Sequence, residues 1–273
     1  MLDCWQKSSD STRRPGTTAP TADGLLSVQL YTLRERLQED LTGTLRALAD
    51  LGFAQVEPFS FTSFGEGGAD LGRALAEAGL AAPTTHQHLV GLSEDELDAV
   101  FAAAAALGIG RVVEPMVGAD RWGTADDVAA VATELNAAAV VGARHGVAVG
   151  YHNHAHELES VIDGRPALEV LADSLDDAVG LEVDTYWVAV GGQDPVALLQ
   201  RLGGRVVALH LKDGPVSTDT ADQVALGQGR MPVADIVAAA PTALRVVELD
   251  DSRGDRLQAV ADSAAFLREQ GLA

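Results

Sequence analysis

The sequence of 273 residues is poor in cysteine, in aromatic side chains, in positive charge and in long apolar runs. Its single cysteine, Cys4, cannot form an intramolecular disulfide, which suits a reducing compartment. Aromatic residues make up only 4% of the chain, so a core must be built mainly from alanine, valine and leucine. No apolar run approaches the ~20 residues that a membrane-spanning helix needs, and no membrane partner is expected.

The charge of the chain is strongly one-sided. It has 40 acidic and 19 basic residues, and its formal net charge is −21. Such a surface repels phosphate backbones, and no basic stripe with interleaved aromatics appears, so nucleic acid is not expected as a partner. A solvated acidic surface that favours solubility explains the excess. The pair Arg13-Arg14 precedes the polar stretch PGTTAPTADG where an export signal would be apolar, so a cytoplasmic location is predicted.

Composition divides the chain near residue 24. Residues 1–23 are rich in serine, threonine, proline and charge, cannot bury apolar surface, and are predicted to form a disordered tail. Residues 24–273 are expected to form a single domain, in which β-branched runs alternate with alanine- and leucine-rich helical stretches. Glycine stands at several joins, as in ADLGFAQVE and AALGIGRVVE, where a helix C-cap needs a left-handed residue.

Eight strand–helix units are predicted in this domain. The strands are expected at 25–31, 54–57, 81–86, 111–114, 147–152, 179–184, 206–211 and 244–249. Helical patterns separate them, for example at 94–107, 125–144, 195–202 and 253–269. Runs such as RVVALHL lack strict alternation, as expected for parallel strands buried on both faces. Eight units in about 250 residues match an α/β (β/α)8 TIM barrel. A doubly wound sheet is the alternative, although no G-x-G-x-x-G follows the first strand.

Titratable residues gather at the predicted strand ends, where a barrel of this kind carries its chemistry. Six of the seven histidines lie there, and the stretch VGYHNHAHELES contains three of them. Each residue also has a structural interpretation. His86 is as compatible with a hydrogen-bonded position at the barrel mouth as with catalysis, and His88 and His156 with solvent-facing positions. Glu57 and Glu114 could pair with arginines. Carboxylates on several adjacent strand ends are costly to bury separately, and one divalent cation explains them together.

The candidate ligands come from four successive strands. They are Glu157 or His152 from the fifth strand, Asp184 from the sixth, His210 from the seventh and Glu248 from the eighth. Period-two alternation places His152 with His154, Glu182 with Asp184, and His210 with Lys212 on shared faces, so the ligands can converge. Oxygen and imidazole ligands without thiolate suit Mn²⁺, Co²⁺, Mg²⁺ or Zn²⁺, and the residues themselves do not choose among these metals.

Four motifs in order carry a family resemblance: GYHNHAHE, LEVDTYWVAVGGQDP, LHLKDG and VVELD. Over residues 25–273 the chain resembles the xylose isomerase-like TIM-barrel superfamily of sugar phosphate isomerases and epimerases, in its Tyr-His-Asn-His branch. The resemblance implies one divalent metal, with Mn²⁺ as the first candidate. Asp184, His210 and Glu248 match the ligand pattern of the family directly. His152 stands where many relatives have a glutamate, so either His152 coordinates or Glu157 reaches back, and charge favours Glu157.

The resemblance implies an isomerase or epimerase that removes a proton next to a carbonyl and forms an enediolate. Candidate catalytic groups are Glu157, Glu248, Lys212 and His86. Candidate substrate-binding groups are His154, Glu114, Trp187 and Glu57. A phosphorylated substrate should need a cationic clamp, and only Lys212 and Arg230 are expected near the mouth. A non-phosphorylated keto-sugar or cyclitol is therefore predicted as the small-molecule partner.

Three other functions stay open at this stage. A dehydratase of a keto-inositol or keto-sugar would use the same metal but expel a hydroxyl. A DNA-repair enzyme resembling endonuclease IV would need several metals and a basic surface, which the net charge of −21 opposes. A non-catalytic sugar-binding protein is the third, although the complete set of Asp184, His210 and Glu248 argues against it. Exposed apolar helices would be compatible with a homodimer.

Overall fold

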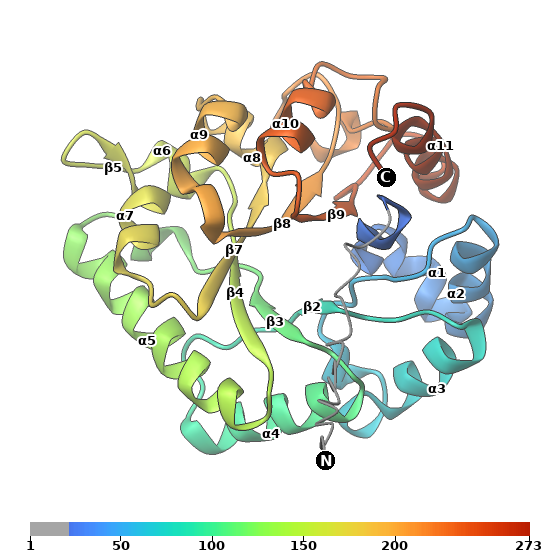
Figure 1. The fold of residues 1–273 in the computed structure, drawn as a ribbon, viewed down its shortest axis with the longest axis horizontal. Coiled ribbons are helices and arrows are strands. Elements are labelled where there is room, and N and C mark those ends of the chain that lie inside the picture. The colour runs from blue at the N-terminus through green and yellow to red at the C-terminus, as the bar shows by residue number, and fades with distance from the viewer. Residues whose placement is uncertain (1–21) are drawn as a thin grey trace, which may run out of the picture.

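The computed structural model describes residues 22–273. Seven parallel strands curl into one sheet inside a ring of helices (Figure 1), which confirms the predicted TIM-barrel class. The strands are β1 (Leu26–Val28), β2 (Thr84–His86), β3 (Arg111–Glu114), β4 (Ala148–His152), β7 (Val179–Asp184), β8 (Val206–Leu211) and β9 (Leu244–Val247). Their order in the sheet is β1-β9-β8-β7-β4-β3-β2. The predicted strands at 111–114, 179–184 and 206–211 have the observed bounds.

The predicted strand at 54–57 does not form a regular strand, and this prediction is wrong in that detail. The segment makes single parallel bridges instead, from Gln55 to Ala81 and from Glu57 to Gln29. The Glu57 N–H donates to Val28 O at 2.8 Å, so the segment lies between β1 and β2 and completes the circle of the barrel. Pro58 follows at once, and because proline has no N–H it cannot extend the ladder.

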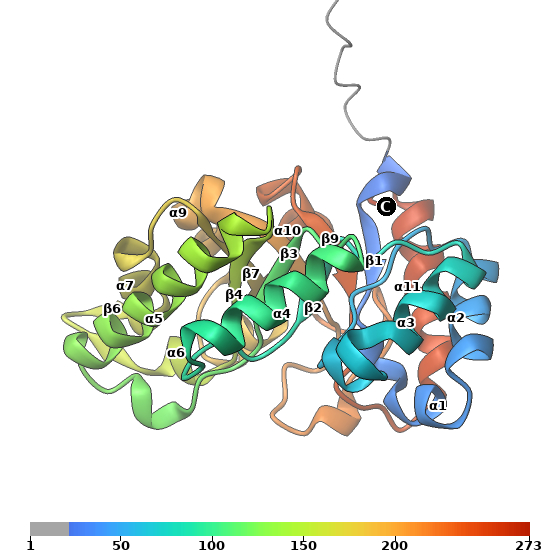
Figure 2. The same ribbon diagram turned by 90° about the horizontal axis from the view of Figure 1, so that it is seen from below.

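The helices cover the outside of the sheet, as the side view shows for α4 and α5 over β3 and β4 (Figure 2). The helices are α1 (Arg34–Glu39), α2 (Leu41–Asp50), α3 (Ala69–Ala78), α4 (Glu94–Ala106), α5 (Ala125–Arg144), α6 (His156–Glu159), α7 (Ala167–Ser174), α8 (Thr185–Val190), α9 (Pro195–Leu202), α10 (Val233–Ala239) and α11 (Arg256–Glu269). A small hairpin, β5 (Val161–Ile162) with β6 (Arg165–Pro166), lies between α6 and α7.

Capping side chains explain where the principal helices begin. Ser93 forms a capping box at the start of α4, Thr124 caps α5, and Asp194 caps α9 just before a proline. The last helix, α11, begins three residues later than predicted because Asp255 accepts the N–H of Gln258 and caps it there. Capping side chains next to each helix therefore mark where it begins.

The interior of the barrel is polar at one end. In β7 all six residues are buried, and alternation turns Glu182 and Asp184 to the side opposite Leu181 and Val183. The apolar side packs under the helices, so the acidic side faces the barrel interior. None of the helices in the described part combines the length and apolarity needed to span a bilayer. Residues 1–21 of the predicted tail, with Cys4, lie outside the described residues, and Ala22–Leu25 form a short 3-10 helix before β1.

Candidate metal centre and cavity

A cavity of 480 Å³ opens at the carboxyl end of the barrel. The ends of β2 and β4 border it directly, and the other strands of the barrel contribute through the segments that follow them. Its lining consists of Tyr31, Arg34, Phe59, Ser60, His86, His88, Pro115, Met116, His152, His154, Trp187, Thr220, Glu248, Asp250 and Asp251. This placement is the one that active sites of TIM barrels occupy.

Four buried side chains converge beside this cavity, and two of them, His152 and Glu248, line it: His152, Asp184, His210 and Glu248. One potential ligand atom from each lies within 4.8 Å of the others. His210 Nδ1 is 2.5 Å from Glu248 Oε2, and His152 Nε2 is 3.8 Å from Asp184 Oδ2. We call these four residues the quartet. Parallel neighbouring strands bring them together because their carboxyl ends meet at one edge of the barrel.

The quartet fits a divalent cation. Asp184 is oriented by the first turn of α8, where its Oδ1 accepts the N–H of Trp187 at 2.9 Å. Its Oδ2 is buried 2.8 Å from Lys212 Nζ, and burial raises the pKa of Asp184 to about 6. Two imidazoles and two carboxylates without thiolate are a donor set typical of catalytic Mn²⁺, Co²⁺ or Zn²⁺ sites.

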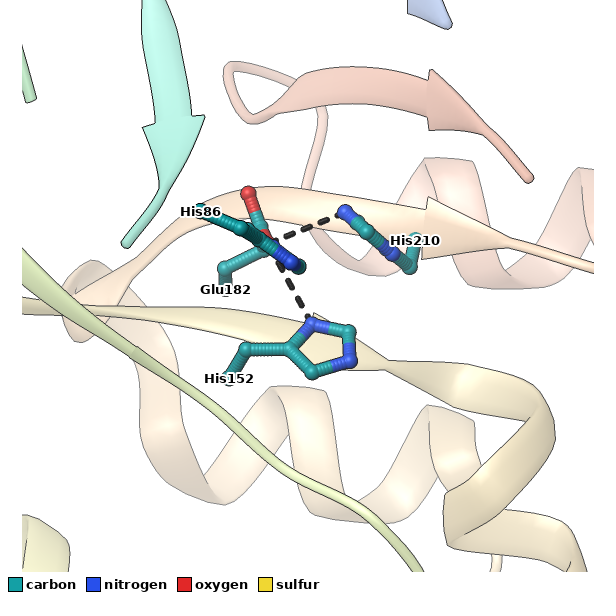
Figure 3. A group of neighbouring side chains, drawn as sticks. All are labelled: His86, His152, Glu182 and His210. Atoms are coloured by element: carbon teal, nitrogen blue, oxygen red, sulfur yellow. Dashed lines mark hydrogen bonds and ion pairs between the residues drawn. The ribbon is translucent and has the colours of Figure 1, made fainter. Parts of the chain in front are cut away.

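Glu182, which was not among the predicted site residues, lies at the centre of a second cluster that shares His152 and His210 with the quartet (Figure 3). Its Oε1 is 2.5 Å from His86 Nε2, 2.9 Å from His210 Nε2 and 3.2 Å from His152 Nδ1. Burial alone would raise the pKa of Glu182, but His210 and His86 hold it well below its usual range. Alternation with Asp184 was the signal in the sequence that placed Glu182 on the same face.

Each histidine of the quartet therefore directs one ring nitrogen to a carboxylate of the quartet and the other ring nitrogen to Glu182. His210 turns Nδ1 to Glu248 and Nε2 to Glu182, while His152 turns Nε2 toward Asp184 and Nδ1 toward Glu182. A carboxylate behind a metal-binding imidazole fixes its tautomer and increases its basicity. Glu182 is placed to do this for two ligands at once.

Glu57 contacts His210 as well and does not border the cavity. It is fully buried and accepts hydrogen bonds from Gln29 Nε2 at 2.9 Å, from His210 Nε2 at 2.7 Å and from the Thr84 hydroxyl. Burial raises its pKa, and the neighbouring charge of Glu182 adds to that rise. The structure thus places this predicted substrate-binding residue behind His210.

Glu157 is held away from the quartet. Its Oε1 accepts the Tyr151 hydroxyl at 2.6 Å and its Oε2 accepts the His154 N–H at 2.9 Å. Because Tyr151 and His152 are successive residues of β4, their side chains point to opposite faces of the sheet. Glu157 pairs with the outward-facing Tyr151, so it is neither in the quartet nor among the residues lining the cavity. Of the two fifth-strand alternatives, the structure groups His152 with the other ligand candidates.

Lys212 lies beside the quartet and is itself buried. Its Nζ is 2.8 Å from Asp184 Oδ2, 2.9 Å from Glu248 Oε2 and 2.8 Å from Asp250 Oδ1. Burial would lower the pKa of this ammonium, but Asp184 and Asp250 raise it well above its ordinary value. The sequence has only two lysines, Lys7 and Lys212, so Lys212 is the only lysine among the described residues 22–273.

Of the other predicted site residues, some line the cavity and one holds a loop at its edge. His86, His154 and Trp187 line the cavity. Glu114 is buried and holds the loop after β2, accepting from Leu89 N at 2.7 Å and lying 2.8 Å from His88 Nδ1. Arg34, which sequence reasoning missed, supplies a cation at the mouth, whereas Arg230 is not among the lining residues.

Comparison with known proteins identifies the family. The family model described as xylose isomerase-like TIM barrel matches residues 45–270. The chain belongs to this family. The match confirms the resemblance carried by the four motifs, and no curated protein matches the sequence.

Solved structures of other proteins share the xylose isomerase-like fold. A sugar phosphate isomerase/epimerase from Parabacteroides distasonis superposes with a TM-score of 0.78 at 24% identity, over 93% of this chain and 96% of the other. A probable 3-DHS dehydratase from Bacillus anthracis gives 0.70 at 13% identity, over 89% and 98%. The IolI protein, whose structure has a bound zinc atom, gives 0.63 at 15% identity, over 90% and 97%.

In this xylose isomerase-like barrel, replacing Glu182 by glutamine is expected to weaken divalent-metal binding about 10- to 100-fold. The change removes the negative charge behind both His152 and His210 but keeps the volume of the side chain. The dissociation constant, measured by titration calorimetry with Mn²⁺, checks this. Glu169→Gln is the matched control, because Glu169 is a largely buried glutamate paired with Arg201 on the outer helices. Equal affinities in the two variants would contradict the assigned role.

Proposed function

We propose that this protein is a divalent-metal-dependent isomerase or epimerase that removes a proton next to a carbonyl of a non-phosphorylated keto-sugar or cyclitol. The observation that carries the proposal is the buried quartet of His152, Asp184, His210 and Glu248 beside the 480 Å³ cavity. The similarity of the fold to sugar isomerases and epimerases supports the same class of chemistry.

A divalent cation held by the quartet would act as a Lewis acid toward a carbonyl and its neighbouring hydroxyl. The chain itself must provide the groups that accept and return the proton. Glu248 and His154 border the cavity and can exchange a proton with a bound substrate, and Lys212 Nζ contacts Glu248 Oε2 at 2.9 Å from behind the lining. One positioned acid or base typically contributes ~10²–10⁴-fold to the rate.

The charges around the cavity favour a substrate without phosphate. Glu248, Asp250 and Asp251 line it, and the ammonium of Lys212 is already surrounded by three carboxylates. Arg34 donates to the backbone oxygens of Tyr31 at 3.0 Å and Asp250 at 2.8 Å, so its guanidinium is partly engaged. A phosphate dianion would meet net repulsion here, whereas polyol hydroxyls can donate to these carboxylates.

Dehydration of a keto-sugar or keto-inositol is the second candidate, and Lys212 is the feature that favours it. Lys212 Nζ, 2.9 Å from Glu248 Oε2, could help this carboxylate pass the abstracted proton to a departing hydroxyl, so that proton removal leads to loss of water. The similar fold of a probable dehydratase is compatible with this outcome. Isomerisation preserves the mass of the substrate, whereas dehydration lowers it by one water, and mass spectrometry of the product separates the two.

The decisive experiment is elemental analysis of the purified protein and of its Asp184→Ala and His210→Ala variants. We expect near-stoichiometric divalent metal in the wild type and loss of it in both variants. Asp173→Ala is the matched control, because Asp173 is an exposed aspartate paired with Arg165 on the surface. Wild-type protein that binds no metal even after dialysis against Mn²⁺ would contradict the proposal. Metal-loaded wild type is then screened with keto-sugars and keto-inositols.

A further inference from the structure

One half of the cavity mouth carries most of its apolar side chains, and the other half carries its carboxylates. The segments after β1, after Glu57 and after β3 contribute Tyr31, Phe59, Pro115 and Met116 to its lining, and the polar lining residues of this half are Arg34, Ser60, His86 and His88. The opposite half, from β9 and the loop after β8, contributes Thr220, Glu248, Asp250 and Asp251. The quartet belongs to β4, β7, β8 and β9, so a metal held by it would lie on the side of the acidic half. We call Tyr31, Phe59, Pro115 and Met116 the apolar wall.

The exposure of this wall is unusual for the molecule. Among residues 24–273, the exposed large apolar side chains are Tyr31, Met116, Val140 and Val161, and two of these four belong to the wall. Met116 is 50% exposed and Tyr31 is 40% exposed. Single exposed apolar side chains need no explanation, but a group that lines one side of a cavity marks a binding surface.

Ring contacts hold the aromatic part of the wall in place. Tyr31 and Phe59 pack edge to face with ring centroids 5.3 Å apart, and Phe59 packs in the same way on Phe64 at 5.9 Å. The Arg34 guanidinium lies 4.3 Å from the centroid of the Tyr31 ring. Ser60, with φ of 42°, donates its N–H to His86 O at 2.7 Å and fixes the turn after Phe59.

The loop that carries Met116 is held on both sides of this residue. The Met116 N–H donates to Glu114 Oε1 at 3.2 Å. Val117 O accepts from Trp122 Nε1 at 3.2 Å and lies 3.0 Å from His156 Nε2. A wall that is already in position loses little conformational entropy when an apolar group packs on it.

We propose that the apolar wall is a subsite for an apolar, aryl-type substituent, and that the substrate is a glycoside whose sugar ring carries the keto group, instead of a free monosaccharide. This proposal rests on the proposed function, because the sugar unit is placed over the quartet and the substituent extends toward strands β1 to β3. A cavity of 480 Å³ falls among those that take ligands larger than one sugar ring, about 300–1,000 Å³. The carboxylates of the opposite half are left to the sugar hydroxyls.

The test compares aryl with methyl glycosides in equilibrium binding. Phenyl and methyl β-D-glucopyranoside, and the corresponding galactosides, are titrated into Mn²⁺-treated wild-type protein by calorimetry. We expect at least one phenyl glycoside to bind about tenfold tighter than its methyl counterpart, because the ring buries apolar area on the wall. In Tyr31→Ala and Met116→Ala this preference should fall several-fold, while methyl glycoside affinity stays within about twofold.

Val140→Ala is the matched control, since Val140 is 60% exposed on α5 away from the cavity. Tyr31 and Met116 are both exposed, so truncating their side chains leaves the core intact. Circular dichroism verifies the fold of each variant. Equal affinities of phenyl and methyl glycosides would overturn the subsite, because the wall would then only stack on the sugar. Absence of phenyl glycoside binding, or a preference unchanged in both variants, would overturn it too.

Two further measurements distinguish the subsite from a dimer interface and test it separately from the proposed function. Sedimentation over a range of concentrations shows whether a second copy of the chain covers the wall. A dimer that Tyr31→Ala and Met116→Ala dissociate would overturn the subsite. The metal assay above tests the proposed function separately, because none of the wall residues is a ligand candidate. If the protein binds no metal but still prefers phenyl glycosides, the subsite is supported and the proposed metal-dependent chemistry is contradicted.

Discussion

Replacing His210 by alanine is expected to lower the unfolding free energy of the metal-free protein by about 3 to 5 kcal/mol and to abolish metal binding. His210 is completely buried between three carboxylates, with Glu248 at 2.5 Å on one nitrogen and Glu57 at 2.7 Å and Glu182 at 2.9 Å on the other. Alanine leaves these carboxylates in the interior without that imidazole. Uncompensated buried charge is among the most costly defects that a single substitution can create.

The pH dependence of this effect has a definite sign. Burial alone would lower the pKa of His210, but Glu182 and Glu248 raise it well above the ordinary value. A histidine whose folded pKa is raised stabilises the protein fully below its unfolded pKa of about 6.5. The stabilisation then declines as pH rises through the folded pKa. Because a metal must displace a proton from this ring, metal affinity should increase as pH rises.

Urea unfolding of metal-free protein at pH 6 and elemental analysis of metal-treated protein measure the two effects. His145→Ala is the matched control, because His145 lies at the end of α5 and pairs with the half-exposed Asp98 at 2.8 Å. A pair of that kind contributes about 1 kcal/mol or less. If His210→Ala kept its metal, or if both variants lost equal stability, the central role of His210 would be refuted.

Replacing Lys212 by methionine is expected to make the stability of the protein depend strongly on metal. Without a metal, the Lys212 ammonium is the cation that contacts Asp184, Glu248 and Asp250. Methionine keeps the approximate volume of the lysine side chain but removes its charge. The metal-free protein should therefore lose about 3 to 5 kcal/mol of unfolding free energy. A divalent cation in the quartet supplies positive charge next to Asp184 and Glu248, so the metal-loaded variant should lose much less.

The measurement is the difference in melting temperature between metal-loaded and metal-free protein. This difference should be larger in Lys212→Met than in wild type by several degrees, at about 2–4 °C per kcal/mol for a chain of this size. Arg201→Met, which removes a half-exposed cation paired with Glu169, should leave the difference unchanged. An equal metal-induced shift in wild type and Lys212→Met would show that Lys212 does not neutralise the ligand carboxylates.

Local signals in the sequence were sufficient for most of the barrel. The strands at 111–114, 179–184 and 206–211 and the helices at 125–144 and 195–202 were predicted with their observed bounds. These elements have clear apolar runs, capping residues and glycines that act over a few residues. The segment at 54–57 failed because two bridges and a following proline, instead of a ladder, close the barrel at that point. Its pairing depends on β1 and β2, which lie far from it in sequence.

The sequence by itself determined the alternation of strands and helices, and hence that Asp184, His210 and Glu248 stand at the carboxyl ends of neighbouring strands. Only the tertiary structure decided that His152 joins them, that Glu157 turns to Tyr151, that Glu182 lies behind both imidazoles, and that Lys212 contacts three carboxylates. The reason is physical. Side-chain alternation is a property of one strand, but the partner of each side chain across a barrel depends on the register between strands and on the path of the loops.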